Sequence, residues 1–198
     1  MEVINHAQRI REAETRERTN RDAAWLNLDA NICGMKFRQM TVKDYLCLDA
    51  VDSPLLLGVI PSAAELAQFL WVLSPDFSER PEDKKRFCER VGKLPYADTL
   101  AACREFVEKT FLDAPQSDGK ASGTPSYYSW ITSLVDTLAS EYGWTPFEVL
   151  ELPLRQVFQL VRAIRKRRDP KAALFNPLSD KARCDWLKAL NEERTQTA

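Results

Sequence analysis

The chain has 198 residues, of which 44% are apolar and 29% charged, as is typical of a globular protein. Its length suits one well-packed domain or two small helical units. A formal net charge of −1 gives no overall attraction to nucleic acid or to an anionic membrane. The longest apolar run, residues 55–60, is too short to cross a bilayer, and the charged N-terminus lacks the apolar core of a secretory signal. We therefore expect a cytoplasmic protein.

Residues 1–40 are predicted to form a charged N-terminal arm and a lead-in to the first packed helix. Arginines and glutamates alternate over residues 9–21, so ion pairs between residues i and i+4 can stabilise a solvated helix with little apolar face. An arm that becomes ordered on a partner is the alternative. From Trp25 to Met40, apolar and polar residues alternate loosely, which leaves room for a short β-hairpin.

Helix signals recur through residues 41–112, the predicted N-terminal helical part. Thr41–Asp44 and Ser62–Glu65 have the spacing of a capping box, in which the two side chains at the start of a helix each bond the other's backbone amide. Two more helices are expected, from about residue 82 to Val91 with Gly92 at its end, and from about residue 97 to Leu112. The short connectors favour neighbouring helices that pack together.

Residues 113–126 are rich in glycine, serine, proline and alanine, which predicts a flexible linker. In the C-terminal helical part, residues 127–190, one helix should end at Gly143 and the next begin at Thr145. A third should follow Pro153, and Ser179 should cap a short last helix before a disordered tail at 191–198. The sequence thus predicts an all-α, bundle-like protein of short helices, with room for one small β-hairpin near the N-terminus. It leaves open whether the two helical parts share one core.

Residues suited to catalysis or metal binding are few. His6 is the only histidine and lies in the charged arm. The sequence therefore lacks a histidine suited to a general base or a catalytic triad, and it cannot form a metal site with several histidines. The five cysteines are scattered and form no C-x-x-C pair, which predicts neither a disulfide framework nor a zinc site. Gly119-Lys120 lacks the first glycine and the Ser or Thr of a phosphate-binding loop. We therefore expect a protein that is not an enzyme and has no metal or cofactor.

A basic cluster ends the helix that follows Pro153. Positive side chains there complement the carbonyl end of the helix dipole, which is the plainest interpretation. Contact with an anionic protein partner is a second interpretation. Nucleic-acid binding is a third, although recognition helices usually read DNA with their N-terminal half. The basic cluster consists of Arg162, Arg165, Lys166, Arg167 and Arg168.

Two stretches resemble proteins encoded in the tail gene clusters of phages and prophages. Residues 40–77 contain a T-V-x-x-x-L-x-L-x-A-x-x-S-P-like helix, an apolar turn and a helix that ends in W-V-L-S-P. Residues 127–170 are similar to the back half of those proteins, including the E-Y-G-W joint and the basic helix end. Together the two stretches cover a little under half of the chain, and the nearest functional class is the phage tail assembly chaperones.

This resemblance implies a small, mostly helical, non-enzymatic protein of the host cytoplasm. Such a chaperone keeps the long tape measure protein soluble and recruits tail tube subunits, so these two proteins are the expected partners. The alternative is a structural virion component, such as a tail or head–tail connector protein, and a third possibility is a DNA-packaging or regulatory DNA-binding protein.

A chaperone for an amphipathic helical client needs an apolar face framed by charges that set specificity. Two groups of residues could supply the apolar face, and the basic cluster could supply the charges. Core packing is the default role of the aromatic residues, whereas an exposed subset would predict a protein-binding patch. The candidate binding residues are Leu66, Phe69, Leu70, Trp71 and Leu73 in one group and Tyr142, Trp144 and Phe147 in the other.

Overall fold

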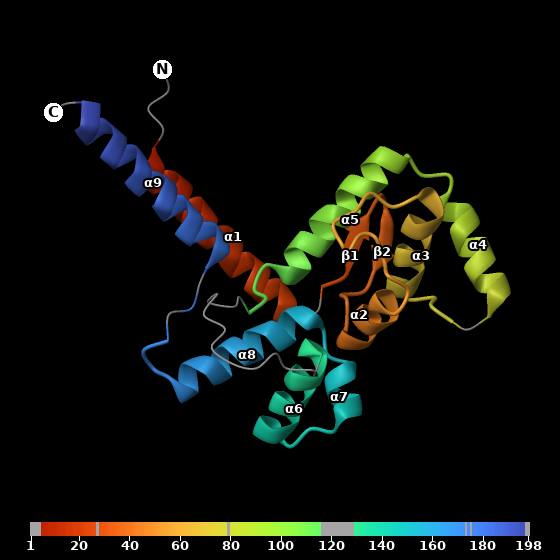
Figure 1. The fold of residues 1–198 in the computed structure, drawn as a ribbon. Coiled ribbons are helices and arrows are strands. Elements are labelled where there is room, and N and C mark those ends of the chain that lie inside the picture. The colour runs from red at the N-terminus through yellow and green to blue at the C-terminus, as the bar shows by residue number, and fades with distance from the viewer. Residues whose placement is uncertain are drawn as a thin grey trace.

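The computed structural model describes residues 5–26, 28–78, 80–115, 129–172, 174 and 176–196, without the side chains of residues 193, 194 and 196. It confirms the predicted all-α class with one small β-hairpin near the N-terminus (Figure 1). Most of the predicted linker lies outside the described residues, as do Tyr127 and Tyr128. The elements are α1 (His6–Trp25), β1 (Ala30–Ile32), β2 (Met35–Phe37), α2 (Val42–Asp49), α3 (Ala63–Leu73), α4 (Pro81–Val91), α5 (Tyr96–Phe111), α6 (Trp130–Tyr142), α7 (Pro146–Leu150), α8 (Leu154–Arg168) and α9 (Pro177–Gln196).

Local capping chemistry sets several helix ends where the sequence predicts them. Complete capping boxes join Thr41 to Asp44, Ser62 to Glu65 and Thr145 to Glu148, and each box satisfies backbone amides that a helix start leaves unpaired. Gly143 ends α6 with a φ of 70°, a left-handed conformation that costs a residue with a β-carbon free energy. Among the described residues, none of the helices is long and apolar enough to span a lipid bilayer.

The end of the chain differs from the prediction. The last helix, α9, begins at Pro177 and continues to Gln196, so Ser179 lies inside its first turn instead of preceding it, and residues 191–196 are helical. The start of α9 obtains its hydrogen-bond acceptor from a distant segment, which a sequence motif cannot reveal.

The N-terminal arm is a helix that lies along α9, and the two helices project together from the body (Figure 1). Glu17 of α1, only 4% exposed, accepts hydrogen bonds from the backbone amides of Leu178 (2.9 Å) and Ser179 (3.3 Å) and from the Ser179 hydroxyl (2.8 Å). A carboxylate at a helix N-terminus satisfies unpaired amides and complements the helix dipole. Farther out, Arg183 pairs with Glu14 at 2.6 Å.

Side-chain amides fix the inner end of α1 to the body. Gln39 Nε2 donates to the backbone carbonyl of Ala23 (3.0 Å), and Gln156 Nε2 donates to that of Ala24 (2.8 Å). These carbonyls belong to the last turn of α1, where no intrahelical donor remains for them. The arm is therefore held at its base by the lead-in after the hairpin and by α8.

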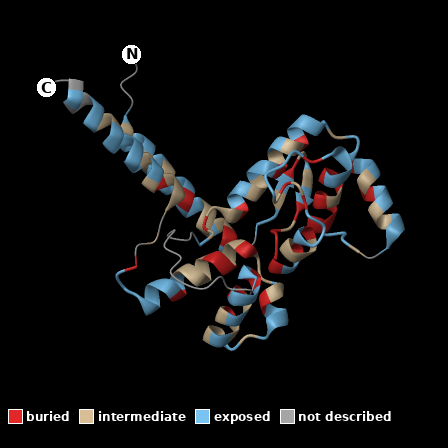
Figure 2. Cartoon of the chain, viewed as in Figure 1, coloured by how far each residue is buried: buried red, intermediate tan, exposed pale blue. Residues whose placement is uncertain are grey.

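The two helical parts share one hydrophobic core, which answers the question that the sequence leaves open. The Val42 amide donates to Leu152 (3.0 Å) and the Leu154 amide to Met40 (2.9 Å), so the starts of α2 and α8 are joined by main-chain bonds. Aromatic contacts also cross between the parts, such as the edge-to-face pair of Tyr45 and Trp130, with ring centroids 4.9 Å apart. Figure 2 shows the buried residues concentrated in the body, whereas most of the arm is exposed.

One buried carboxylate, Asp113, follows α5 in the shared core. It is 7% exposed, and Gln159 Nε2 donates to its Oδ2 at 2.5 Å. Burial raises the pKa of Asp113 above its usual value, and the nearby charges of Arg162, Arg21 and Arg155 offset only part of that effect. The folded state therefore retains the proton of Asp113 at a higher pH than the unfolded chain does.

From this pKa we predict that the contribution of Asp113 to the free energy of unfolding falls as the pH rises from its unfolded pKa through its folded pKa. Asp113→Asn should reduce that fall, since the amide can still accept from Gln159 but cannot ionise. Part of the slope should remain, because burial also raises the pKa of Asp44. Urea denaturation between about pH 4 and pH 7 tests the prediction. Asp98→Asn, an equal change of charge at an exposed site, is the control, and equal slopes for the two variants would contradict it.

Candidate protein-binding surfaces

The first predicted binding group, on α3, is buried, which corrects its assignment as an exposed apolar face. α3 lies in the middle of the body, where Phe69 packs edge-to-face on Phe106 of α5 and Trp71 packs on Phe87 of α4. The periodicity identified a helix face correctly, but neighbouring helices cover it. The exposed fractions are 2% for Leu66, 0% for Phe69, 0% for Leu70, 3% for Trp71 and 0% for Leu73.

The second predicted group divides between the core and the surface. Tyr142 and Trp144 stack on each other across Gly143, with ring centroids 4.8 Å apart, and both are half-buried against the core. Phe147, in the first turn of α7, is 80% exposed. Only Phe147 therefore presents most of its ring to a binding partner.

Tyr142 and Trp144, at the junction of α6 and α7, lie beside the C-terminal end of α8, which carries the basic cluster. Glu141, next to Tyr142, accepts hydrogen bonds from Arg167 and from Arg168, whose Nε lies 2.9 Å from Glu141 Oε1. The bond from Arg168, together with the charges of both arginines, holds the pKa of Glu141 below its usual value. Two of the predicted site arginines thus tie α8 to α6.

Other members of the basic cluster hold the segment that follows α8. Arg162 donates to Asn176 Oδ1 at 2.8 Å, and Lys166 Nζ donates to the carbonyl of Ala172 at 3.0 Å. Arg165 is exposed, and its carbonyl accepts from the amide of Asp169, which ends the helix. These contacts favour a structural role for the cluster at the C-terminal end of α8.

Four exposed apolar side chains lie between α2 and α3. We call Val51, Leu57, Val59 and Ile60 the connector patch, and their exposed fractions are 51%, 65%, 56% and 68%. The sequence shows an apolar connector here but no periodicity that would assign it to a surface. An aliphatic run between two helix caps, too short for a helix of its own, is the signal that could have identified it.

The backbone under the connector patch is held by hydrogen bonds. The Ser53 amide donates to Leu48 (3.0 Å) and the Val59 amide to Pro54 (2.8 Å), which closes two consecutive turns. Gly58 completes the second turn with a φ of 73°, a conformation that favours glycine. The patch is therefore presented in a defined conformation, so a partner has little backbone to order.

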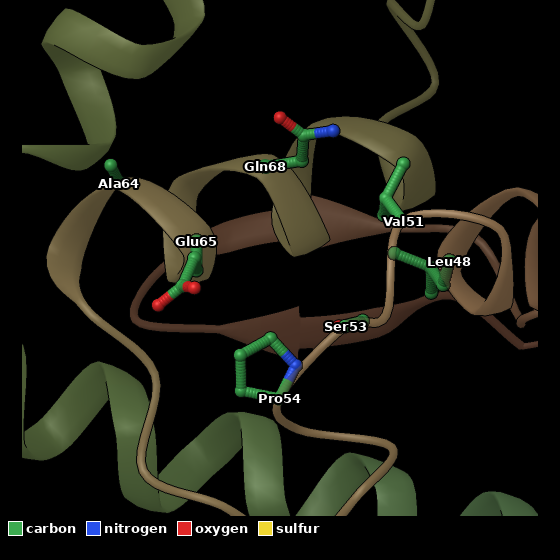
Figure 3. A pocket seen from close by; sticks show the side chains of 7 residues that line it. All are labelled: Leu48, Val51, Ser53, Pro54, Ala64, Glu65 and Gln68. Atoms are coloured by element: carbon green, nitrogen blue, oxygen red, sulfur yellow. The ribbon is translucent and has the colours of Figure 1, made fainter.

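Beside the connector patch is a shallow pocket of about 210 Å³ (Figure 3). Its carboxylate, Glu65, is held at the start of α3 by the amide of Ser62 (2.6 Å), and this hydrogen bond lowers the pKa of Glu65. Such a volume matches a single apolar side chain better than a small-molecule ligand, whose sites span about 300–1,000 Å³. The lining residues are Leu48, Val51, Ser53, Pro54, Ala64, Glu65 and Gln68.

The described residues contain no group of three or more His, Cys, Asp or Glu side chains placed to hold a metal ion. Cys103 is fully buried, and burial raises the pKa of its thiol to about 12, so the reactive thiolate is strongly disfavoured.

In comparisons with known proteins, no family model, no curated protein and no solved structure matches this chain.

Proposed function

We propose that this chain is a non-enzymatic assembly protein that binds another protein through the connector patch. The observation that carries the proposal is the exposure of Val51, Leu57, Val59 and Ile60 on a backbone fixed by hydrogen bonds. Several exposed apolar side chains on one segment commonly mark a protein contact, because their burial is favourable on association. The adjoining pocket has room for one anchoring side chain of the partner.

The chemistry of the connector patch suits an amphipathic helix. A helical client presents apolar side chains at i, i+3, i+4 and i+7, of which one could enter the pocket while the others cover the patch. The resemblance to phage tail assembly chaperones supplies a client of this kind. We therefore propose the tape measure protein, and with it the tail tube protein, as partners in the host cytoplasm.

The test is co-expression with the tape measure protein encoded in the same tail gene cluster, followed by size-exclusion chromatography. The double variant Leu57→Ser/Ile60→Ser should bind at least roughly tenfold more weakly, as expected when apolar anchors at an interface are lost. Its fold should be preserved, since substitutions at exposed positions usually change stability by at most about 0.5 kcal/mol.

Leu187→Ser is a matched control, because Leu187 is 54% exposed but lies on α9. Unchanged binding by the folded double variant would contradict the role of the connector patch. Purified phage particles distinguish the two assembly roles, since a chaperone should be missing from them and a structural virion component should be retained.

A further inference from the structure

A second concave surface, separate from the connector patch, lies between α1, β1 and α5, the elements labelled in Figure 1. This cleft has a volume of about 580 Å³, within the range of about 300–1,000 Å³ usual for ligand sites. Side chains of Leu28, Ile32, Ala102 and Phe106 make much of its wall apolar. The remaining walls of the cleft are polar, so the class of ligand that fits can be inferred from the polar groups that face the cleft.

Two polar atoms at the cleft have no hydrogen-bond partner among the described residues: Asn20 Nδ2, a donor, and Gln39 Oε1, an acceptor. The orientation of each side-chain amide is fixed by the hydrogen bond that its other polar atom makes. Asn20 Oδ1 accepts from Arg155 at 2.5 Å, and Gln39 Nε2 donates to the carbonyl of Ala23 at 3.0 Å. Flipping either amide would break these bonds, so a buried donor and a buried acceptor remain unsatisfied.

Both residues lie at the inner end of α1, because Asn20 is one turn before Ala23 and Gln39 bonds the Ala23 carbonyl. A ligand that satisfies both must offer an acceptor to Asn20 and a donor to Gln39. A peptide backbone does this, since the N–H and C=O of one residue in an extended chain point to the same side.

The strand β1 offers a third contact of the same kind. Ile32 and Met35 flank the two-residue turn of the hairpin, so the next pair, Asn31 and Lys36, is the one without mutual hydrogen bonds. The N–H and C=O of Asn31 consequently point away from β2. Asn31 also lines the cleft, where an extended chain could pair with this free edge.

The charges around the cleft favour a neutral ligand. Glu105 and Lys109 on α5 form an ion pair at 2.6 Å, and Arg155 is committed to Asn20. Arg16 and Asp29 add one charge of each sign to the lining. With Arg16, Lys109 and Arg155 against Asp29 and Glu105, the lining has an excess of only one positive charge, which is too little for a polyanion.

We propose that this cleft binds an extended segment of a partner polypeptide through its backbone, with the C=O of one residue accepting from Asn20 and the N–H of the same residue donating to Gln39. Both atoms are shielded from solvent, so the cleft side chains must move outward as the segment enters. This proposal does not rest on the connector patch or on the tail assembly function, and variants at either surface should leave binding at the other unchanged.

The probe is the blocked neutral peptide acetyl-Ala-Val-Ala-Val-Ala-amide, titrated into the isotope-labelled full chain and followed by NMR. Binding in the millimolar range should shift the side-chain amide signals of Asn20 and Gln39, while that of Gln156, which caps α1 elsewhere, stays in place. The same peptide with its central nitrogen methylated cannot donate to Gln39 and should bind at least roughly tenfold more weakly.

Asn20→Asp removes the donor but keeps the oxygen that accepts from Arg155, and it should also weaken binding at least roughly tenfold. Asn191→Asp makes the same chemical change at an exposed position of α9 outside the cleft lining, and should bind as the unmodified chain does. The absence of shifts at Asn20 and Gln39 would overturn the proposal. Equal binding of the methylated peptide would also overturn the proposal. This comparison uses the unmodified chain, so it does not depend on whether a variant folds.

Discussion

Trp71→Ala is expected to lower the free energy of unfolding by roughly 3–5 kcal/mol, the cost typical of removing a large aromatic side chain from a core. Trp71 is 3% exposed and contacts the rings of Phe77 and Phe87, with centroids 5.7 and 5.2 Å away. The cavity left by the indole would border both rings, and the surrounding helices could close it only in part. Urea denaturation followed by circular dichroism would measure the loss, which is a large part of the roughly 5–15 kcal/mol that stabilises a typical domain.

Phe147→Ala is the matched control, because it also removes an aromatic ring but at a position 80% exposed, and it should change stability by about 0.5 kcal/mol or less. If the two variants were equally stable, Trp71 would not be part of the core. The contrast also governs the design of binding experiments. A Trp71 variant that fails to bind a partner reports the loss of the fold, whereas a Phe147 variant can report the loss of a contact.

Glu17→Ala should detach the arm, weakening the association of α1 with α9 by roughly 2–4 kcal/mol, since it leaves charge-assisted hydrogen bonds unmade and buried donors unsatisfied. The carboxylate accepts from two amides and one hydroxyl at the start of α9. Neither helix buries much apolar surface elsewhere, and isolated helices of this length are only marginally stable in water. Loss of this contact should therefore reduce the helical signal and speed hydrogen exchange of the α9 amides, while the amides of α3 stay protected.

Glu14→Ala is the matched control on the same helix. Glu14 pairs with Arg183 at 2.6 Å, but both side chains are about half exposed, so the pair should contribute less than about 1 kcal/mol. Equal exchange rates in α9 for the two variants would show that Glu17 does not hold the arm.

Several elements could be predicted from sequence because their causes are local. The capping boxes at Thr41, Ser62 and Thr145 each involve residues within one helical turn, so their spacing is visible in the chain. Gly143 is a second local case, since its left-handed conformation depends on its own lack of a β-carbon. The hairpin is a third, because Cys33 and Gly34 form a two-residue turn that the alternating pattern around it permits.

The start of α9 could not be predicted for the opposite reason. Ser179 has the residue type of a helix cap, yet the acceptor that satisfies the helix start is the carboxylate of Glu17. That contact joins the two ends of the chain. Nothing in the residues around Ser179 encodes it, and only the pairing of α1 with α9 brings the two groups together.

The sequence by itself determined the class of the protein, several of its helix ends and the apolar stripe of α3, because these depend on residue type and on spacing of a few positions. Only the tertiary structure decided which apolar residues are hidden. The stripe on α3 is covered by α4 and α5, whereas the aliphatic residues of the connector patch are left on the surface. Burial depends on neighbours that are remote in the chain, and periodicity describes one face of one helix without stating what covers it.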